Sequence, residues 1–429
     1  MLLLTSVARF WLNGWVDDFF VTPDHFFHFW GMDAIVVPSR PALLAMMGTM
    51  ALLSVLITLG LFYRVATFGF FALFTYVELV DVTNYLNHYY LVSLLTLVMA
   101  FLPANAAWSL DVRRRPALRR NSVPAWIYGL LRLQVGVVYV FAAMAKFNTD
   151  WLLGAQPLNI WLAARTDLPL VGELLGHFEV ALAMSWLGFL FDLLIVPALL
   201  WDRTRRFAWP VALCFHAMTS ILFNIGMFPI IMSVATTIFF APSWPRRFIR
   251  GAKPATAAGP SFPRWAFGIA AVWCAVQLLV PLRFLAYEGP VAWHEQGMRF
   301  AWKVMIREKN GTVDYRVETA DGRTTRVSPR RYLTDYQERE MGGQPDLILQ
   351  LAHHIAADYA AKGEGPVKVY ADSFASLNGR PPARLIDPTV DLAMVSDGLM
   401  PKSWILPAPD GPPIRLRSSG PLQLTERSR

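Results

Sequence analysis

The chain has 429 residues, of which 55% are hydrophobic and only 16% are charged, and its formal net charge is +8. Soluble domains contain about a quarter of charged residues, so this composition excludes an ordinary soluble protein, a disordered chain and a disulfide-linked scaffold. Aromatic residues make up 14% of the chain, and aromatic rings are enriched where lipid meets water. The composition therefore predicts an integral membrane protein.

Apolar segments long enough to cross a membrane recur over the first two-thirds of the chain. A spanning helix needs about 20 mostly apolar residues. Residues 1–15 resemble the end of such a span and are short for a complete one. We expect a mainly α fold in which residues 1–283 form a polytopic transmembrane helix bundle of about 8–9 spans. Besides the first segment, the candidates are residues 43–63, 66–81, 89–104, 123–147, 177–201, 207–223, 227–242 and 264–283.

Arginine clusters between the apolar segments predict the topology. The clusters occupy residues 113–120, 203–206 and 246–250, and short arginine-rich loops stay in the cytoplasm. Alternating nine segments places all three clusters on one side of a cell or inner membrane, with the N-terminus cytoplasmic and everything after residue 284 extracytoplasmic. No basic stripe with interleaved aromatics is present, so no nucleic-acid partner is expected.

From about residue 284 the composition becomes that of a globular domain. Residues 313–319 alternate between apolar and polar types, and Asp321-Gly322 follows as a hairpin turn signal. An apolar residue recurs every four positions after Pro345, which predicts an amphipathic helix. We expect a small extramembrane α+β domain over residues 284–408, and a disordered tail over the Pro-, Ser- and Arg-rich residues 409–429.

Lys146 is the first candidate functional residue. The first 283 residues contain only two lysines, and Lys146 ends the apolar run of its segment, whereas Lys253 lies in a predicted loop. A lysine near the end of a span can simply extend its amine to the interface. Alternatively, a desolvated lysine can become neutral near physiological pH and act as a base, which an arginine cannot do.

Two further ionisable residues within the spans suggest a structural ion pair. Arg132 and Asp192 each lie about nine residues from the cytoplasmic end of their predicted helices, or roughly 13 Å deep at 1.5 Å per residue. Equal depth and opposite charge predict that they pair and set the register of the two helices.

Asn87, His88 and His216 complete the set of candidate site residues. Asn87 and His88 begin a span on the same outer side as Lys146, and His216 lies a few residues below that level. A single histidine on an apolar face is commonly a satisfied core residue. The alternative is that amide, imidazole and amine converge on a polar headgroup such as a quinone, whose oxygens need donors and a base.

No metal site is expected from the sequence. The two cysteines, Cys214 and Cys274, do not have zinc-ligand spacing. The His294-Glu295 pair has no second histidine at metal-binding spacing, and we expect it on the surface.

Several stretches around these residues resemble the vitamin K-dependent gamma-carboxylases, membrane proteins with an HTTM domain. The resemblance covers about residues 5–405 of a chain that is shorter than the animal enzymes, and Ala145 stands where those enzymes have a second lysine. The stretches that carry it are VTNYLNHYYL at 82–91, VYVFAAMAKFNTDWL at 138–152, FHAMTSILFNIGMF at 215–228, SWPRR at 243–247, RFAWKVM at 299–305, DGRT at 321–324 and IDP at 386–388.

The resemblance implies a specific chemistry. In that family a lysine matching Lys146 deprotonates a vitamin K-type hydroquinone, oxygenation gives an epoxide, and the strong base so formed removes a proton from a peptide glutamate, which takes up carbon dioxide. The resemblance thus implies that Lys146 is the catalytic base and that His88 and Asn87 orient oxygens or the glutamate at the reaction centre. His216 matches the family by position only, and it stays a candidate quinol-binding residue, with Asn87, because of its residue type and level. The implied partners are membrane lipid, the quinol with O2 and CO2, and a glutamate-containing peptide on the extracytoplasmic side.

Two other functions remain open at this point. The chain could bind or epoxidise a quinone without carboxylating glutamate, or it could be a non-catalytic protein built on the HTTM scaffold. A non-catalytic protein would keep its function after loss of Lys146, whereas either quinone chemistry would not.

Overall fold

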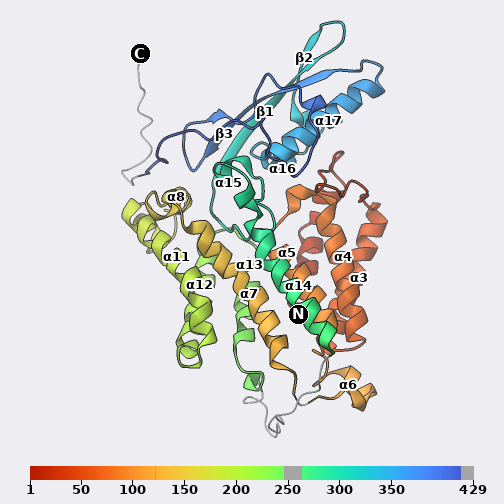
Figure 1. Ribbon diagram of the computed structural model, residues 1–429, viewed down its shortest axis with the longest axis vertical. Helices are drawn as coiled ribbons and strands as arrows, with labels where there is room; N and C mark the ends of the chain where they lie inside the picture. The colour runs from red at the N-terminus through yellow and green to blue at the C-terminus, as the bar shows by residue number, and fades with distance from the viewer. Residues whose placement is uncertain (121, 246–262, 417–429) are drawn as a thin grey trace.

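The computed structural model describes residues 1–120, 122–245 and 263–416. Figure 1 shows a bundle of helices with a small sheet domain at one end. This arrangement confirms the expected fold class, a mainly α helical bundle followed by a small α+β domain.

The bundle helices run alternately toward and away from the sheet domain (Figure 1). Their bounds agree with the predicted apolar segments to within a few residues, and the first helix is short, as expected. In chain order they are α1 (Leu2–Leu12), α3 (Arg40–Leu59), α4 (Tyr63–Val80), α5 (Asn87–Phe101), α7 (Ala125–Lys146), α11 (Phe178–Leu200), α12 (Asp202–Leu222), α13 (Phe228–Ala235) continued by η3 (Thr236–Phe239), and α14 (Arg264–Leu279) continued by η5 (Val280–Ala286).

In the part of the chain that the structure describes, five helices are long and apolar enough to cross a membrane: α3, α4, α7, α11 and α14 with η5. Helices α1, α5 and α13 with η3 are apolar but shorter. The most apolar window of α14 and η5 has a mean hydropathy of 1.9, yet only 11% of it is buried. Such a surface would be unstable in water, so it must face lipid.

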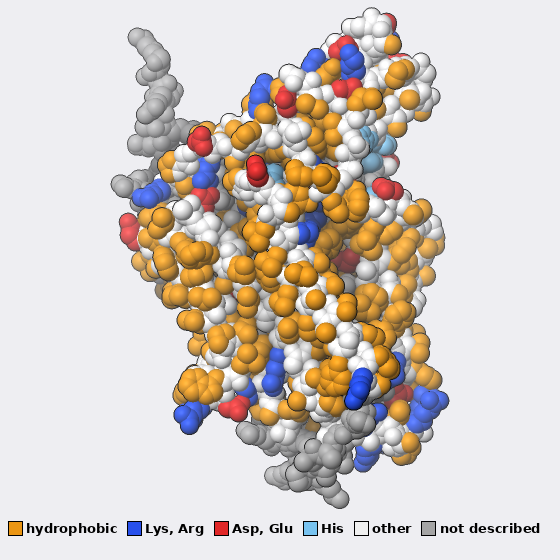
Figure 2. Space-filling model, viewed as in Figure 1, with side chains coloured by type: hydrophobic (Ala, Val, Ile, Leu, Met, Phe, Trp, Pro, Cys, Tyr) orange, Lys and Arg blue, Asp and Glu red, His pale blue; other side chains and the backbone are white. Residues whose placement is uncertain are grey.

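Charged residues gather at the two ends of the bundle. On the face that Figure 2 shows, a broad apolar surface covers the helices, with Lys and Arg side chains at the end farthest from the sheet domain. That end carries α6 (Leu110–Arg114), η2 (Pro116–Leu118) and the start of α12, which include the first two arginine clusters. The third, at residues 246–250, lies outside the described residues. Which end faces the cytoplasm stays a prediction from the arginines.

Short helices connect the long ones at the end near the sheet domain. Two of these connections, α8 with α9 and the segment around η1, carry residues that the candidate site uses. The connecting helices are α2 (Trp15–Phe20), η1 (Val82–Asn84), α8 (Thr149–Leu152), α9 (Leu158–Ala163) and α10 (Gly172–Leu175).

The sheet domain contains one antiparallel sheet of four strands in the order β2-β1-β3-β4. The predicted hairpin is confirmed, since Glu318 pairs with Thr324 across the Asp321-Gly322 turn. The predicted amphipathic helix is α17, whose Leu347, Leu351 and Ile355 are fully buried. The elements are α15 (Val291–His294), β1 (Lys309–Glu318), β2 (Thr324–Val327), η6 (Pro329–Arg331), α16 (Asp335–Met341), α17 (Pro345–Ala361), β3 (Lys368–Leu377), β4 (Ala383–Arg384) and η7 (Leu392–Met394).

Hydrogen bonds from α16 and α17 hold the sheet domain on the bundle. The Gln350 side chain accepts from the His28 backbone N–H and donates to the His28 carbonyl, both at 2.9 Å. The Gln337 amide donates at 2.8 Å to the carboxylate of Asp81, which follows α4. Because these bonds join distant parts of the chain, they fix the sheet domain above the bundle.

The described part of the predicted tail packs against the bundle. The Gln156 side chain donates to the Ile414 carbonyl at 2.6 Å, and the Leu416 N–H donates to the Asn159 side chain at 2.8 Å. Residues 417–429, the rest of the predicted tail, lie outside the described residues.

Candidate active site

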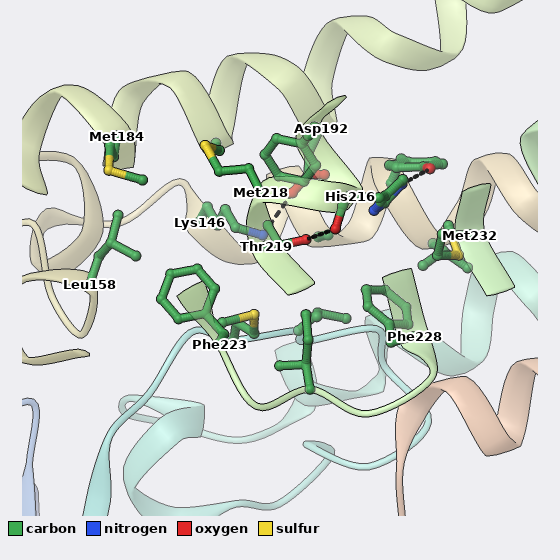
Figure 3. Close-up of a pocket in the computed structure, with 18 of the residues that line it drawn as sticks. Lys146, Leu158, Met184, Asp192, His216, Met218, Thr219, Phe223, Phe228 and Met232 are labelled. Carbon is green, nitrogen blue, oxygen red and sulfur yellow. Dashed lines mark hydrogen bonds and ion pairs between the residues drawn. The ribbon is translucent and has the colours of Figure 1, made fainter. Parts of the chain in front are cut away.

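A pocket of about 80 Å³ lies among α7, α11, α12 and α13, near the end of the bundle that carries the sheet domain. Figure 3 shows methionine and phenylalanine side chains around it, with Lys146 and Asp192 on one side and His216 on another. We call this the inner pocket. Its polar side chains are Lys146, Asp192, His216, Tyr139 and Thr219.

Lys146 and Asp192 form a buried ion pair in the inner pocket. The Lys146 Nζ lies 2.7 Å from the Asp192 Oδ2, and the lysine residue is only 6% exposed. The same nitrogen lies 5.2 Å from the centroid of the Trp151 ring. The amine is therefore held away from bulk water, which excludes the interpretation of Lys146 as a lysine that extends to the interface.

The sequence after Lys146 explains how the amine is held. The Asn148 side chain donates to the Ala145 carbonyl at 2.8 Å and accepts from the Trp151 N–H at 2.9 Å. One asparagine thus satisfies the end of α7 and the start of α8. The Trp151 indole donates to the Ser185 carbonyl of α11 at 2.8 Å. These bonds fix the end of α7 against the helix that carries Asp192.

His216 lies in the same pocket, on α12. Its Nε2 is 2.7 Å from the Tyr139 hydroxyl of α7. Its backbone carbonyl accepts from the Thr219 hydroxyl at 3.0 Å. Figure 3 shows His216 near the Lys146–Asp192 pair. The structure therefore brings together Lys146 and His216, as predicted from the sequence.

His88 and Asn87 lie apart from Lys146. The Phe228 ring contacts both histidines, with centroids 6.0 Å from His88 and 6.5 Å from His216, and His88 is not among the residues that line the inner pocket. Asn87 accepts from the Tyr85 hydroxyl at 3.1 Å and lines a second cavity. The roles proposed for these two residues rest on the sequence resemblance.

The second cavity, which we call the outer cavity, has a volume of about 590 Å³ and lies between the bundle and the sheet domain. Phe223, Ile225 and Met305 line both cavities, so the two are neighbours. The outer cavity is much more highly charged than the inner pocket. Its charged side chains are Arg165, Arg299, Lys303, Arg307, Glu295 and Glu340.

Burial changes the proton affinity of several groups in the outer cavity. Burial lowers the pKa of Lys303 to about 8 and that of Arg307 to about 10. Burial also raises the pKa of Glu340, although Arg307 opposes that shift. Perturbed groups of this kind gather at functional sites.

The predicted ion pair between Arg132 and Asp192 is wrong. Asp192 pairs with Lys146, and the Arg132 guanidinium donates to the carbonyls of Ile238, Phe239 and Phe240 at 3.1, 3.1 and 3.2 Å. These carbonyls end η3, where no further helical turn can satisfy them. A cation at a helix C-terminus is also electrostatically favourable, so Arg132 caps a helix instead of pairing with a carboxylate.

The depth predicted for Asp192 from its position along the helix was wrong. The contacts between Trp151 and Ser185 put α8 level with the second turn of α11. The first two turns of α11 therefore extend beyond the end of α7, and Asp192 lies at the level that the Lys146 side chain reaches. The predicted depths assumed that both helices end in one plane.

The His294-Glu295 pair is buried, contrary to the expectation of a surface position. Only 8% of His294 is exposed. The Glu295 carboxylate pairs with Arg307 and, at 3.3 Å, with Lys309. Ion pairs with these two cations stabilise the glutamate in the interior. The spacing of residues in the sequence did not indicate these pairs.

The sequence reasoning missed Tyr139 and Trp151. Tyr139 precedes Lys146 by two helical turns on α7, so a residue at that spacing shares its face. The spacing could therefore have predicted that Tyr139 lies beside Lys146. Trp151 lies beyond the helix end, and no periodic signal could have placed its ring beside the amine.

Both parts of the chain match known protein families. The family model of the HTTM domain matches residues 1–244, and that of the vitamin K-dependent gamma-carboxylase lumenal domain matches residues 263–411. No solved structure matches the chain. Since the two matches together cover the bundle and the sheet domain in the order seen here, the chain belongs to the vitamin K-dependent gamma-carboxylase family of integral membrane proteins.

Proposed function

We propose that this protein is a membrane enzyme that couples oxygenation of a vitamin K-type quinol to carboxylation of glutamate in a peptide, with Lys146 as the base. The observation that carries the proposal is the buried Lys146–Asp192 pair in an apolar pocket that also holds His216. An ionisable pair in such a place is expensive, and ionisable groups within spans are functional candidates.

The side chains of the inner pocket suit a quinol. A quinol ring has two oxygens on an otherwise apolar frame, and here the Lys146 amine, the His216 imidazole and the Tyr139 hydroxyl face apolar walls. The pocket of about 80 Å³ is smaller than the cavity of about 150 Å³ that holds benzene in a protein core. Met184, Met218 and Met232 line it, and these flexible side chains can rotate to admit the ring.

Asp192 gives Lys146 a place to pass a proton. The Nζ and Oδ2 atoms are 2.7 Å apart, so one proton can reside on either of them while the pair stays neutral overall. When that proton is on Asp192, the amine is free to accept one from the hydroxyl of a bound quinol. Lys146 then becomes an ammonium beside the neutral Asp192 carboxyl, and its positive charge is balanced by the quinol anion next to it, so the site as a whole gains no net charge.

The quinol, with O2, supplies the energy to make a base far stronger than any side chain. The protein must keep water from that base, and the apolar walls around Lys146 do so. The outer cavity adjoins the inner pocket through Phe223, Ile225 and Met305. We propose that a glutamate side chain reaches the inner pocket from the outer cavity.

The test is an assay of the purified protein in lipid with reduced vitamin K or menaquinol, O2, a glutamate peptide and labelled bicarbonate. We expect quinone epoxide and labelled peptide from the wild type, and neither from Lys146→Ala. Lys368→Ala is the matched control, because Lys368 lies on the sheet domain with a side chain that is 58% exposed. It should keep both products.

The two products separate the possible functions. Absence of epoxide from the wild type, or equal epoxide from Lys146→Ala, would refute the proposal. Epoxide without labelled peptide would retain the quinol chemistry and remove the carboxylation.

A further inference from the structure

Lys303 is a buried lysine for which the described residues provide no hydrogen bond or ion pair. In the described chain three Lys or Arg residues are less than a tenth exposed as whole residues: Lys146, Arg205 and Lys303. The side chain of Lys309 is also only 2% exposed, and it pairs with Glu295. Lys146 pairs with Asp192, and Arg205 pairs with Asp202 and donates to the Leu199 carbonyl. Across the described ranges, no hydrogen-bond acceptor or carboxylate contacts the Lys303 Nζ. A lysine with so little exposure and no ion-pair partner is costly, so its position needs a reason.

The loop that carries Lys303 is rigid and strained. Phe300, Trp302 and Met305 all have positive φ angles, between 54° and 59°, which residues other than glycine rarely adopt and which cluster at functional sites. Trp302 is 1% exposed and stacks on Tyr90 of α5 at 5.0 Å. The bundle therefore holds this loop in place.

The same loop serves both cavities. Lys303 lines the outer cavity, whereas Val304 lines the inner pocket and Met305 lines both. The Lys303 Nζ lies 3.4 Å from the centroid of the Phe284 ring, so an aromatic face supports the cation from one side. Its amine is thereby fixed at the border between the two cavities.

The other charged groups of the outer cavity are already largely compensated. Arg299 pairs with Asp346, and Arg307 pairs with Glu295, which also receives Lys309 at 3.3 Å. Arg165 donates to the Leu222 carbonyl at 2.9 Å and lies 3.9 Å from Asp167.

Glu340 is the remaining charged group. No ion pair to Glu340 is present among the described residues, and the cations whose charges act on it are Arg307, Arg339 and Arg299. Lys303 therefore faces the cavity with its charge unused.

We propose that Lys303 is the anion anchor of the outer cavity and holds the carboxylate of an acidic side chain at the entrance to the inner pocket. This role rests on the proposed function, because it supplies the glutamate that the Lys146 site would use. Lys303 is then a positioning residue, which pairs with the carboxylate while the rest of the side chain reaches toward Lys146. Figure 2 shows Lys and Arg side chains where the sheet domain meets the apolar surface of the bundle.

The first test measures binding without catalysis. The whole protein in lipid is treated at pH 8 with formaldehyde and a borane reductant, which methylate neutral amines, and methylation of Lys303 is followed by mass spectrometry. N-acetylglutamate methylamide should protect Lys303, because the bound carboxylate keeps the amine protonated and covers it. The glutamine analogue should not protect. Lys309, buried and already paired with Glu295, is the internal control, and its methylation should not respond to either compound.

Each other outcome counts against the proposal. Failure of Lys303 to become methylated in the absence of acid would mean that the amine is closed to the cavity. Equal protection by the glutamine analogue would remove the role of the carboxylate. Protection by bicarbonate but not by the glutamate compound would assign the site to the inorganic anion. Because this test needs no turnover, it can succeed even if the carboxylase activity is absent.

The second test compares Lys303→Met with Lys303→Arg in the coupled assay. A charge-assisted hydrogen bond contributes about 1.5–3 kcal/mol, so Lys303→Met should raise the KM for the glutamate peptide by about 10- to 100-fold. The KM for the quinol should not change. Lys303→Arg keeps the charge and should recover part of the peptide affinity. Equal effects of both variants on both KM values would point to a general loss of structure and would overturn the proposal.

Discussion

Two buried lysines of this protein line neighbouring cavities, and only one of them pairs with a carboxylate. Lys146 sits in the inner pocket with its amine 2.7 Å from Asp192. Lys303 lines the outer cavity, and no carboxylate of the described residues forms an ion pair with it. The paired lysine can exchange a proton within a neutral pair, and the unpaired lysine offers a fixed positive charge.

This difference matches the two tasks that the proposed reaction would need. A base in a dry site must be able to lose its proton without leaving a charge behind, which a carboxylate partner allows. A binding site for an anion needs the opposite, a cation that no internal carboxylate has neutralised. If the two lysines have these separate roles, variants of Lys146 should affect the quinol chemistry and variants of Lys303 should affect peptide binding.

The largest effect should follow replacement of Lys146. Lys146→Met should abolish epoxide formation and should also destabilise the protein by about 3–5 kcal/mol, because it leaves Asp192 buried without a partner. The double variant Lys146→Met/Asp192→Leu replaces the whole pair by apolar groups. It should recover thermal stability in lipid while remaining inactive. A double variant as unstable as the single one would show that the pair itself does not explain the stability loss.

Asp192→Asn should reduce activity while preserving the structure. Asparagine can still accept a hydrogen bond from Lys146 but cannot take up its proton. We expect kcat for epoxide formation to fall by about 10²- to 10⁴-fold, the usual contribution of proton transfer, with little change in the KM for the quinol. Asp202→Asn is the control, since Asp202 is exposed and pairs with Arg205 at the far end of the bundle. Full activity of Asp192→Asn would exclude a role for its carboxylate in proton transfer.

The sequence was sufficient to predict the elements but not all of their contacts. Hydrophobic segments placed α7 at 125–146 and α11 at 178–200 nearly correctly, because a spanning helix must be long and apolar. Alternation and the Asp321-Gly322 turn likewise predicted β1 and β2. These features depend on neighbours along the chain, which a single sequence contains.

The partners across the bundle could not be obtained in the same way. Asp192 was recognised as unusual, but its partner depends on how far α11 extends beyond α7, which short connecting helices decide. Lys303 belongs to a motif to which the sequence assigns no role, because only the folded chain shows that this lysine is buried without an ion-pair partner among the described residues. A sequence shows which lysines are isolated among apolar residues, but the groups that contact their amines depend on how the helices pack.

Alkaline pH should weaken peptide binding through loss of the Lys303 charge. Burial lowers the pKa of Lys303 to about 8, whereas a glutamate carboxylate stays ionised at any pH well above about 4.3. The charged amine that holds the anion is therefore lost as the pH rises through 8. We expect the KM for the glutamate peptide to rise by about tenfold between pH 7.5 and 9, measured in the coupled assay with the quinol saturating.

Two variants sharpen this pH prediction. Lys303→Arg stays charged over the whole range, so its peptide KM should be nearly independent of pH. Lys303→Met should also show a flat profile, at a higher KM. A wild-type rise that persists in Lys303→Met would belong to another group and would contradict the assignment.

The smallest effect should come from loosening the sheet domain, because the outer cavity needs that domain in place and the Lys146–Asp192 pair does not. Gln350→Leu removes both side-chain hydrogen bonds to the His28 backbone, at a cost of about 1–2 kcal/mol. Hydrogen exchange at the His28 amide should therefore accelerate by roughly 5- to 30-fold, and the peptide KM should rise a few-fold with no change in the quinol KM. Gln296→Leu serves as the control, since the Gln296 amide bonds to the Met400 carbonyl within the sheet domain, and it should leave the exchange at His28 unchanged. An equal rise in both KM values for Gln350→Leu would mean that the inner pocket also depends on the docked domain, and the two lysines would then no longer be separable.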